Sequence, residues 1–378
     1  MRHLPLLTNS AAKKFLDCPQ AYYLSYERLI RPIAASEPLT FGDLMHKALE
    51  AWWNAAQVAP ATPCDGCGGA ACVECMGCGY RGPSEWLRSA FHVLAVDTDP
   101  WRRATLESLM IGYAARWWRM RWEGAPYDGA PIEVLAVEQE FAGPMSNPAT
   151  RGESKTWQRG GKIDVLVRVR TDLLPTNTDP APTMASLPVW VVEHKTSSED
   201  FSAGSPYRAR LRLDTQVSGY HVGARLLGHE QVAGVLYDVI GKPGLKPLKA
   251  TPIDKRRYTK REGRLDARQR ETDETVPEYQ ARLLDDIAGA GGGYYARFEV
   301  VRLADEEEAA ARDTWMVAQA IRDAKRLNRW PRNPGACSKY GGRACEYLPI
   351  CVGDATENDG TRYRRAETAH EELAQKAA

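Results

Sequence analysis

The stretch Val189–Lys195, with the sequence VWVVEHK, constrains the fold of this chain more than any other part of it. Four apolar residues lead directly into Glu193, His194 and Lys195, which is typical of a buried β-strand that ends at a polar edge. Because side chains alternate across a strand, Glu193 and Lys195 share one face and His194 lies on the other. A carboxylate beside an ammonium group suits a metal ligand next to a cation that handles water. An ordinary strand end that dips into solvent would give the same pattern.

Length and charge limit the classes of protein that this chain can belong to. Its 378 residues allow one elaborated domain or two. There are 50 basic and 49 acidic residues, so any phosphate-binding surface must be local. The sequence has no apolar run long enough for a membrane span, and its opening residues lack the apolar core of a signal peptide. We therefore expect a cytoplasmic protein without membrane contacts, whose nine cysteines are reduced and favour metal binding over disulfides.

The first part of the chain is predicted to be helical. Asn9 and Ser10 are typical helix caps, and Pro19 fits the first turn of a second helical piece. Residues 39–54 carry apolar side chains at helical spacing, with His46 just beside the apolar stripe. A histidine in that position is more often packed or capped than a metal ligand. Residues 84–122 predict two further helices that pack in the core.

Strands follow, and one of them carries a second acidic residue. Residues 132–141 alternate between apolar and polar side chains, with Glu138 and Glu140 on one face. Residues 160–170 and 188–195 can form an antiparallel pair, which would bring Asp164 towards Glu193. An acid among β-branched residues costs free energy unless it is paired or bound to a metal.

The second half of the chain alternates between predicted helices and strands. A helix is expected over Tyr207–Leu227, where Gln216 and Tyr220 lie one turn apart on one face. A surface glutamine and a half-buried tyrosine are the simpler interpretation of this pair alone. Strands are expected at 232–240 and 294–302, a helix at 304–329, and a frayed helix or disordered tail from 355 onward.

Two basic stretches are candidates for contact with DNA. Basic residues interleaved with tyrosine can follow a phosphate backbone, although a solvated loop explains them equally well. The candidate contacts are Arg208, Arg210 and Arg212 at the start of the predicted 207–227 helix, and Lys255, Arg256, Arg257, Lys260 and Arg261 in the turn-rich segment 241–275.

The first cysteine cluster has the spacing of a zinc knuckle. Cys64 and Cys67 form one C-x2-C pair, and Cys75 and Cys78 form another. Such pairs hold tetrahedral Zn²⁺ because a two-residue turn points both sulfurs inward. Cys72 is spare or substitutes for one of the four, so the exact ligands stay open. A flexible cysteine-rich loop is the alternative.

The second cluster has an odd number of cysteines. It comprises Cys337, Cys345 and Cys351, and a four-ligand site needs one more. Cys18 is the only unclaimed candidate if the knuckle keeps its own four. A lone cysteine is usually a small buried hydrophobe, but Cys18 precedes a proline among tyrosines.

In this order, the pieces resemble the RecB-like branch of the PD-(D/E)xK nuclease superfamily, especially its iron–sulfur exonucleases. Those include small CRISPR-associated exonucleases, the nuclease of AddAB helicase–nucleases and related phage proteins. The matching motifs are LTNSAAKKFLDCPQAYYL, FGDLMHKALE, GGKIDV, VVEHK, QVSGY and the C-terminal cysteines. The resemblance covers nearly all of the chain except 58–83, 171–188, 241–275 and the tail. It implies an α/β fold with a restriction-endonuclease-like core, in which helices flank a mixed central sheet.

The resemblance also implies roles for individual residues. Asp164, Glu193, His46 and the backbone carbonyl of His194 would bind Mg²⁺ or Mn²⁺. Lys195 would orient or deprotonate the attacking water, and Glu140 would support a second ion. Gln216 and Tyr220 would position the strand or the site.

A 4Fe–4S cluster on Cys18, Cys337, Cys345 and Cys351 is implied as well, as a staple between the N-terminal helix and the C-terminus. Members of the family commonly have two residues between the second and third of these cysteines, whereas this chain has seven. Zinc in the same site is the alternative.

The same resemblance divides the chain into regions. These are an N-terminal helical part (1–57), a knuckle-like insertion (58–83), a helical region (84–130), the nuclease core (131–303), a C-terminal helix with the cysteine cluster (304–354) and a polar tail (355–378).

Two functions are expected from these features. The first is a Mg²⁺- or Mn²⁺-dependent DNA exonuclease acting on single-stranded or frayed ends in recombination, repair or phage DNA processing. The second is a non-catalytic or weakly catalytic DNA-end-binding subunit of a larger complex. The chain has no helicase P-loop, so unwinding would need a helicase or recombination partner. No recognition domain indicates a sequence-specific endonuclease.

Overall fold

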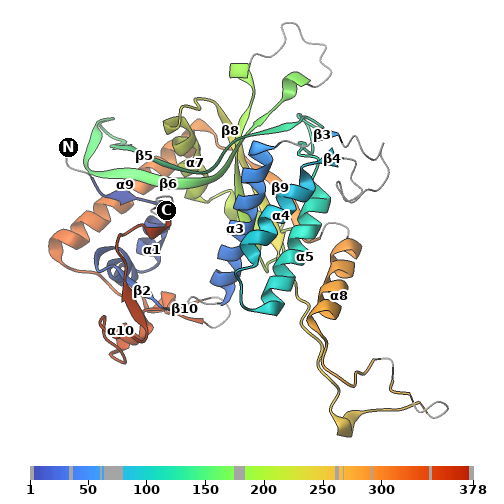
Figure 1. Cartoon of the computed structure of the whole chain (residues 1–378). Coiled ribbons are helices and arrows are strands. Elements are labelled where there is room, and N and C mark those ends of the chain that lie inside the picture. Colours follow the sequence, from blue (N-terminus) through green and yellow to red (C-terminus); the bar gives the residue numbers. More distant parts are fainter. Residues whose placement is uncertain are drawn as a thin grey trace.

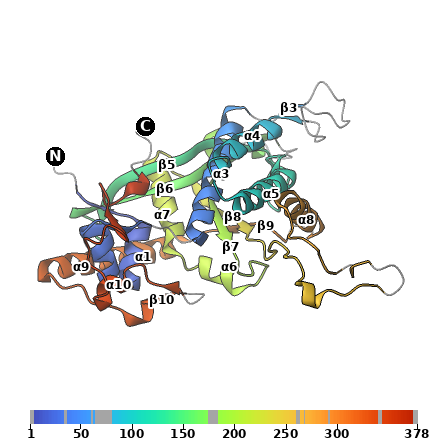
Figure 2. The same cartoon turned by 60° about the horizontal axis from the view of Figure 1, so that its bottom comes forward.

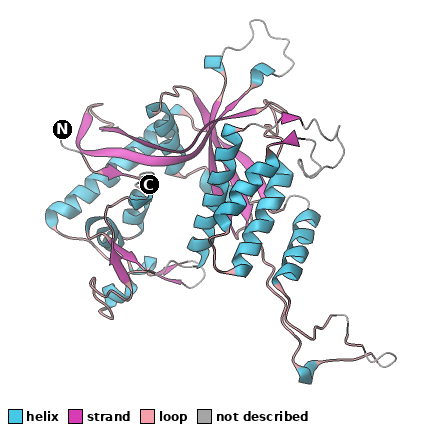
Figure 3. Ribbon diagram, viewed as in Figure 1, coloured by secondary structure: helices cyan, strands magenta, loops and turns pink. Residues whose placement is uncertain are grey.

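The computed structural model describes residues 4–33, 37–59, 62–63, 80–173, 184–259, 264–266, 268–290, 293–339 and 343–373. Within these ranges a six-stranded mixed sheet lies at the centre, with helices on both of its faces (Figures 1 and 3). This arrangement confirms the predicted α/β class. No helix in the described ranges is long and apolar enough to cross a membrane.

The sheet is built around one long hairpin. Its strands are β1 (Leu6–Leu7), β5 (Ile132–Ser146), β6 (Glu153–Val169), β7 (Val189–Ser197), β8 (Val232–Gly241) and β9 (Tyr295–Val300). Strands β5 and β6 pair antiparallel, β7 pairs antiparallel with β6, β8 runs parallel to β7, and β9 closes the sheet antiparallel to β8. The predicted pairing of β6 with β7 is confirmed, with Val165 opposite Val192. Asp164 therefore lies next to Glu193.

Helices cover the two faces of the sheet. The α-helices are α1 (Asn9–Asp17), α2 (Pro19–Tyr22), α3 (Glu37–Val58), α4 (Pro83–Leu94), α5 (Pro100–Trp117), α6 (Pro206–Leu211), α7 (Thr215–Leu226), α8 (Val276–Gly289), α9 (Ala304–Leu327) and α10 (Leu348–Val352). Short turns of 3₁₀ helix lie at Thr171–Leu173, Met184–Ser186, Ile253–Lys255, Pro334–Ala336 and Glu371–Leu373, and a π-helical turn lies at Tyr23–Glu27.

The alternation predicted for β7 decides which helices lie on which face. Trp190 and Val192 pack into the core formed with α3, α4, α5 and α8. Val189 and Val191 pack into a second core with α6 and α7. Glu193 continues on the α7 side, so the polar end of the strand emerges where α7 begins.

Two predicted helix boundaries are wrong. Thr8 caps α1 in place of Asn9 and Ser10, because its hydroxyl accepts a hydrogen bond from the Ala11 N–H. The single helix predicted over Tyr207–Leu227 is two helices. The first ends at Leu211 with Arg212 as its C-cap. Asp214 begins the second, because its carboxylate accepts the Gln216 N–H at 2.9 Å.

The C-terminal segment is ordered where the structure describes it, so the frayed helix or disordered tail predicted from 355 onward is wrong as far as residue 373. Strand β12 (Tyr363–Arg365) pairs antiparallel with β2 (Ile30–Pro32). Between α9 and β12 lie a small hairpin, β10 (Ser338–Lys339) with β11 (Arg343–Ala344), and α10. Figures 1 and 2 show these C-terminal elements gathered beside α1. The two ends of the chain therefore pack together.

Two insertions lead away from the sheet. The knuckle cysteines Cys64, Cys67, Cys75 and Cys78 lie outside the described residues, but the strands flanking them, β3 (Thr62–Pro63) and β4 (Tyr80–Arg81), pair antiparallel. The segment between β8 and α8 forms an arm that projects from the body of the protein (Figures 1 and 2). In this arm Tyr258 bridges to Leu265.

Substituting Tyr363→Ala is expected to lower the free energy of unfolding by about 3 kcal/mol, because a buried aromatic ring is removed from a packed site. Tyr363 stacks 6.4 Å from Tyr347, and its hydroxyl donates to the carbonyl of Glu346 at 2.9 Å. Urea denaturation measures the change. Tyr258→Ala, which removes a 53% exposed ring from the arm, is the control and should shift stability by less than about 0.5 kcal/mol. Equal effects would contradict the packing of β12.

Candidate active site

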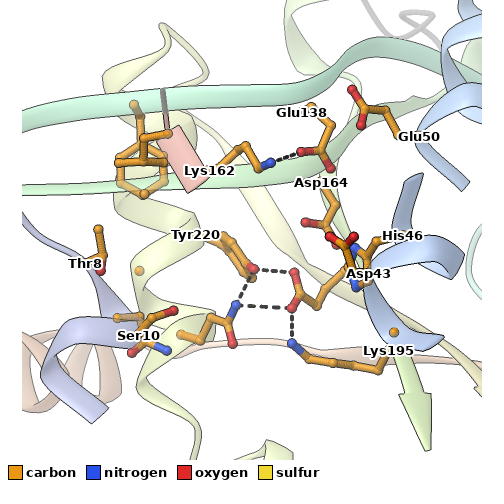
Figure 4. Close-up of a pocket in the computed structure, with 18 of the residues that line it drawn as sticks. Thr8, Ser10, Asp43, His46, Glu50, Glu138, Lys162, Asp164, Lys195 and Tyr220 are labelled. Carbon is orange, nitrogen blue, oxygen red and sulfur yellow. Dashed lines mark hydrogen bonds and ion pairs between the residues drawn. The ribbon is translucent and has the colours of Figure 1, made fainter. Parts of the chain in front are cut away.

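A cavity of about 670 Å³ lies between α1, α3, α7 and the polar end of the sheet (Figure 4). It collects side chains from segments that are far apart in sequence. The predicted site residues that line it are His46 from α3, Asp164 from β6, Glu193 and Lys195 from β7, and Gln216 and Tyr220 from α7. The motifs that carry these six residues therefore meet in one place.

Glu193 is the most heavily bonded of these residues. It is only 2% exposed. Lys195 and Gln216 both donate to Oε1, and Tyr220 donates to Oε2 (Figure 4). Burial raises the pKa of Tyr220 well above its ordinary value, and the charge of Glu193 raises it further, so the hydroxyl remains a donor. These three donors offset the cost of burying the carboxylate.

Asp164 is buried beside other acids with less compensation. Its Oδ2 accepts the backbone N–H of His194 at 3.0 Å. Burial raises the pKa of Asp164 well above its ordinary value, and the nearby charges of Glu193 and Glu138 raise it further. A divalent cation bound here would relieve that repulsion, and carboxylate oxygens are the ligands that such cations prefer. The residues therefore fit a metal.

His46 supplies a nitrogen donor to the same place. Its Nδ1 lies 3.7 Å from Asp164 Oδ2. Burial and the neighbouring His194 lower the pKa of His46 to about 4, so the imidazole is neutral at pH 7 and has a lone pair for a metal. The backbone of His194 also interacts with the His46 ring, which puts the predicted carbonyl ligand next to this group.

Glu138 is a site residue that the sequence analysis did not assign. Ligand atoms of His46, Glu138 and Asp164 all lie within 4.8 Å of one another, and no other metal-binding group of this kind occurs in the described ranges. Glu138 has a left-handed backbone (φ 51°) and pairs with Lys162. Glu140, the acid assigned from sequence, is not among the residues that line the cavity. The pairing of β5 with β6 could have identified Glu138. Val137 pairs with Val165 and Gln139 pairs with Ile163, so Glu138 lies opposite Asp164.

A buried polar network supports β7 from the opposite face. His194 Nδ1 lies 3.3 Å from Asp238 on β8, and Asp238 also accepts bonds from Tyr113 and Arg297. Although burial opposes it, the Arg297 guanidinium keeps the pKa of Asp238 well below its ordinary value. Sequence analysis did not find this network, because its members come from four separate elements.

The four cysteines within the described ranges gather at the opposite end of α1 from the cavity. Cys18, Cys337, Cys345 and Cys351 are free and half-buried. Burial raises the pKa of Cys351, Arg332 opposes this, and the other three cysteines raise it further. Cys345 donates its backbone N–H to the Cys337 carbonyl at 2.8 Å, so these two residues lie next to each other. Cysteine thiolates are the usual ligands of iron–sulfur clusters and of zinc, although these four sulfurs do not form a group as tight as that of His46, Glu138 and Asp164.

Some of the candidate DNA-contacting residues are engaged within the protein. Arg208 donates to the Phe201 carbonyl at 2.7 Å and stacks over Phe298, and Arg210 pairs with Glu199. Arg256 donates to two backbone carbonyls of the arm. Arg212, Lys255 and Arg257 are exposed, and Lys260 and Arg261 lie outside the described residues.

A family model matches most of the chain. The model of the PD-(D/E)XK nuclease superfamily matches residues 7–352, which include the site residues of the cavity and the four gathered cysteines. No curated protein matches the chain.

The metal-free protein is expected to gain thermal stability when Mn²⁺ is added, since a cation at Asp164 binds only the folded state. A hundredfold excess over Kd corresponds to about 2.7 kcal/mol. Asp164→Asn should abolish this gain, and it should raise the unfolding temperature of the metal-free protein by removing like-charge repulsion. Asp43→Asn, at an exposed acid on the rim of the cavity, is the control and should retain the gain. A full response in Asp164→Asn would put the metal elsewhere.

Proposed function

The chain belongs to the PD-(D/E)XK nuclease superfamily, and from this premise we propose that it is a metal-dependent DNA exonuclease. It would hydrolyse phosphodiester bonds at single-stranded or frayed ends, in recombination, repair or phage DNA processing. The observation that carries the proposal is the buried group of His46, Glu138 and Asp164 beside Glu193 and Lys195 in one cavity.

The residues divide the chemistry among them. His46, Glu138 and Asp164 would hold Mg²⁺ or Mn²⁺, with Glu193 and the His194 carbonyl completing the set. When bound, such a cation lowers the pKa of the attacking water and neutralises charge on the phosphate. Lys195 orients that water and stabilises negative charge as it builds up on the phosphate oxygens.

Gln216 and Tyr220 act through Glu193. Both donate hydrogen bonds to its carboxylate, so they fix the position of that side chain while substrate binds. The backbone N–H of His194 does the same for Asp164. Because these supports come from β7 and α7, the geometry of the site is set before substrate arrives, which lowers the cost of reaching the transition state.

The alternative is a DNA-end-binding subunit with little or no catalysis. It would keep the cavity and the basic surface and act within a larger complex. The set of acids together with Lys195 favours catalysis, because a binding surface for an anion gains nothing from burying three carboxylates. Unwinding of duplex DNA would still need a helicase or recombination partner, since the chain has no P-loop.

We also propose that Cys18, Cys337, Cys345 and Cys351 hold a 4Fe–4S cluster. Their half-buried, mutually interacting thiols support this, while the seven residues between Cys337 and Cys345 keep Zn²⁺ as the alternative in the same site. A separate structural Zn²⁺ on Cys64, Cys67, Cys75 and Cys78 remains a prediction from spacing.

Part of the DNA-binding surface would lie on the arm. Lys255 and Arg257 are exposed there and close to Tyr258, which is 53% exposed. An exposed aromatic ring that follows cations in the chain offers stacking to a base, and the cations offer charge to a phosphate. Arg212 at the end of α6 would add to this surface.

Wild-type protein with Mn²⁺ is expected to degrade end-labelled single-stranded DNA, and Glu193→Gln should slow cleavage by about 10³-fold. Lys195→Met should lose cleavage to a similar extent while its affinity for DNA changes little, because the loss falls on the transition state. Lys47→Met, at the rim of the same cavity, is the matched control and should cleave normally. Binding without cleavage by the wild type, across several metals and DNA ends, would favour the end-binding subunit.

Anaerobically purified protein is expected to contain about four iron and four sulfide per chain, bound through thiolates. Cys351→Ser should reduce both contents and the visible absorbance of the cluster. Cys72→Ser, outside both predicted sets of four, should leave them unchanged. Stoichiometric zinc without sulfide, lost in Cys351→Ser, would replace the cluster by the zinc alternative.

A further inference from the structure

Arg159 stands apart from the other cations in the wall of the cavity. The described cavity-lining lysines all have partners: Lys47 pairs with Asp43, Lys162 with Glu138 and Lys195 with Glu193, and Lys242 lies over the Phe41 ring. For the guanidinium of Arg159, no hydrogen-bond or ion-pair partner exists among the residues that the structure describes. Its five N–H donors therefore have no acceptor among the described residues.

The topology of the sheet explains how this arginine comes to the cavity wall. Strand β1 runs parallel to β6 and places Leu7 opposite Arg159. The next residue, Thr8, caps α1, so the first turn of that helix lies beside the arginine, and Asn9 and Ser10 line the cavity with it. On the other side Gly219 of α7 leaves room for the side chain, since a Cβ there would stand 3.1 Å from Nη2 of Arg159.

The guanidinium of Arg159 is charged, but no described carboxylate forms an ion pair with it. Burial lowers the pKa of Arg159 to about 10, against the opposing charge of Glu307 on α9, so it remains a cation at neutral pH. Glu307 is itself bonded to His221 and Arg225, both at 2.8 Å. A largely desolvated cation whose nearest carboxylate is engaged elsewhere is costly unless an anion binds to it.

Resting on the proposed nuclease function, we propose that Arg159 binds a phosphate group of the DNA strand in the cavity, at a subsite separate from the metal group. The planar fork of arginine matches a phosphate in two-point contact. The amino end of α1 adds a favourable dipole on the same side. Arg159 and Asp164 are five residues apart on β6, in a stretch whose pairing with β5 has no register shift, which separates their backbones by about 17 Å. On this proposal Arg159 therefore binds a phosphate other than the one that is cleaved.

Two kinds of phosphate share this chemistry. One is a terminal phosphomonoester at the end of a strand, and the other is an internal phosphodiester a short way from the scissile bond. If Arg159 binds a terminal phosphate, the subsite recognises strand ends. If it binds an internal phosphate, the subsite positions the strand regardless of its end. The two are distinguished by the DNA ends offered.

Binding can be tested without chemistry by fluorescence anisotropy of a labelled single-stranded oligonucleotide in EDTA. Arg159→Gln is expected to lose about tenfold in affinity. The slope of log affinity against log salt should also fall by about 0.7, as expected for one lost phosphate contact. Arg322→Gln removes the same charge from an exposed position on α9 and should change neither quantity. Arg159→Lys keeps the charge but loses the fork, so its affinity should fall severalfold with the slope retained, and it decides the matter if Arg159→Gln fails to fold.

The ends of the oligonucleotide identify the source of the phosphate. If the loss in Arg159→Gln is confined to strands carrying a 5′- or a 3′-phosphate, the subsite takes a terminal group. An equal loss with hydroxyl ends assigns it to an internal phosphodiester. If Arg159→Gln and Arg159→Lys both match Arg322→Gln in affinity and slope, the proposal is wrong, even where Glu193→Gln stops cleavage. Loss of affinity in a protein that never cleaves would instead retain the subsite and reject the proposed function.

Discussion

Like-charge repulsion among Asp164, Glu193 and Glu138 is the interaction that the surroundings of the cavity are arranged to offset. Each carboxylate has a partner of its own: Glu193 has Lys195, Gln216 and Tyr220, Glu138 has Lys162, and Asp164 has the backbone N–H of His194. Removing one partner would leave a buried charge uncompensated, which costs several kcal/mol. Asp164 has only a neutral donor, so a bound cation would stabilise this carboxylate more than the other two. The candidate metal site is thus the same place as the repulsion among these acids.

This arrangement needs a rigid β7, and the buried network behind it supplies the rigidity. His194 is the register partner of Asp238 on β8, and Arg297 reaches the same carboxylate from β9. Tyr113 on α5 bonds to Asp238 as well, so three strands and a helix are tied together directly beneath the site. Both faces of β7 become polar at neighbouring residues, because Glu193 points to the cavity and His194 points to this network. The apolar run of the strand therefore ends at Val192.

Sequence reasoning reached the parts of the site that follow from regular geometry. Strand alternation placed Glu193 and Lys195 on one face, hairpin pairing brought Asp164 to Glu193, and helical spacing joined Gln216 to Tyr220. It missed what depends on irregular backbone or distant contacts. Glu138 reaches the group through a left-handed residue that no alternation pattern predicts. The pairing of β12 with β2 joins residues more than 300 positions apart, and nothing local in a polar tail indicates it.

Helix α1 links the cysteine group to the cavity. A metal or cluster bound by the cysteines would therefore be connected to the cavity through this helix. Cys18 directly follows the last residue of α1, while Thr8 at its start lines the cavity beside Arg159. Nine helical residues span only ~13 Å, so a shift at one end moves the other. A ligand that joins Cys18 to Cys337 would close a very long loop and restrict the unfolded chain. It would also hold α1 against the C-terminal elements, and with α1 the part of the cavity wall next to Arg159. If the proposed cluster binds there, it would therefore act on the cavity through α1 even in a purely structural role.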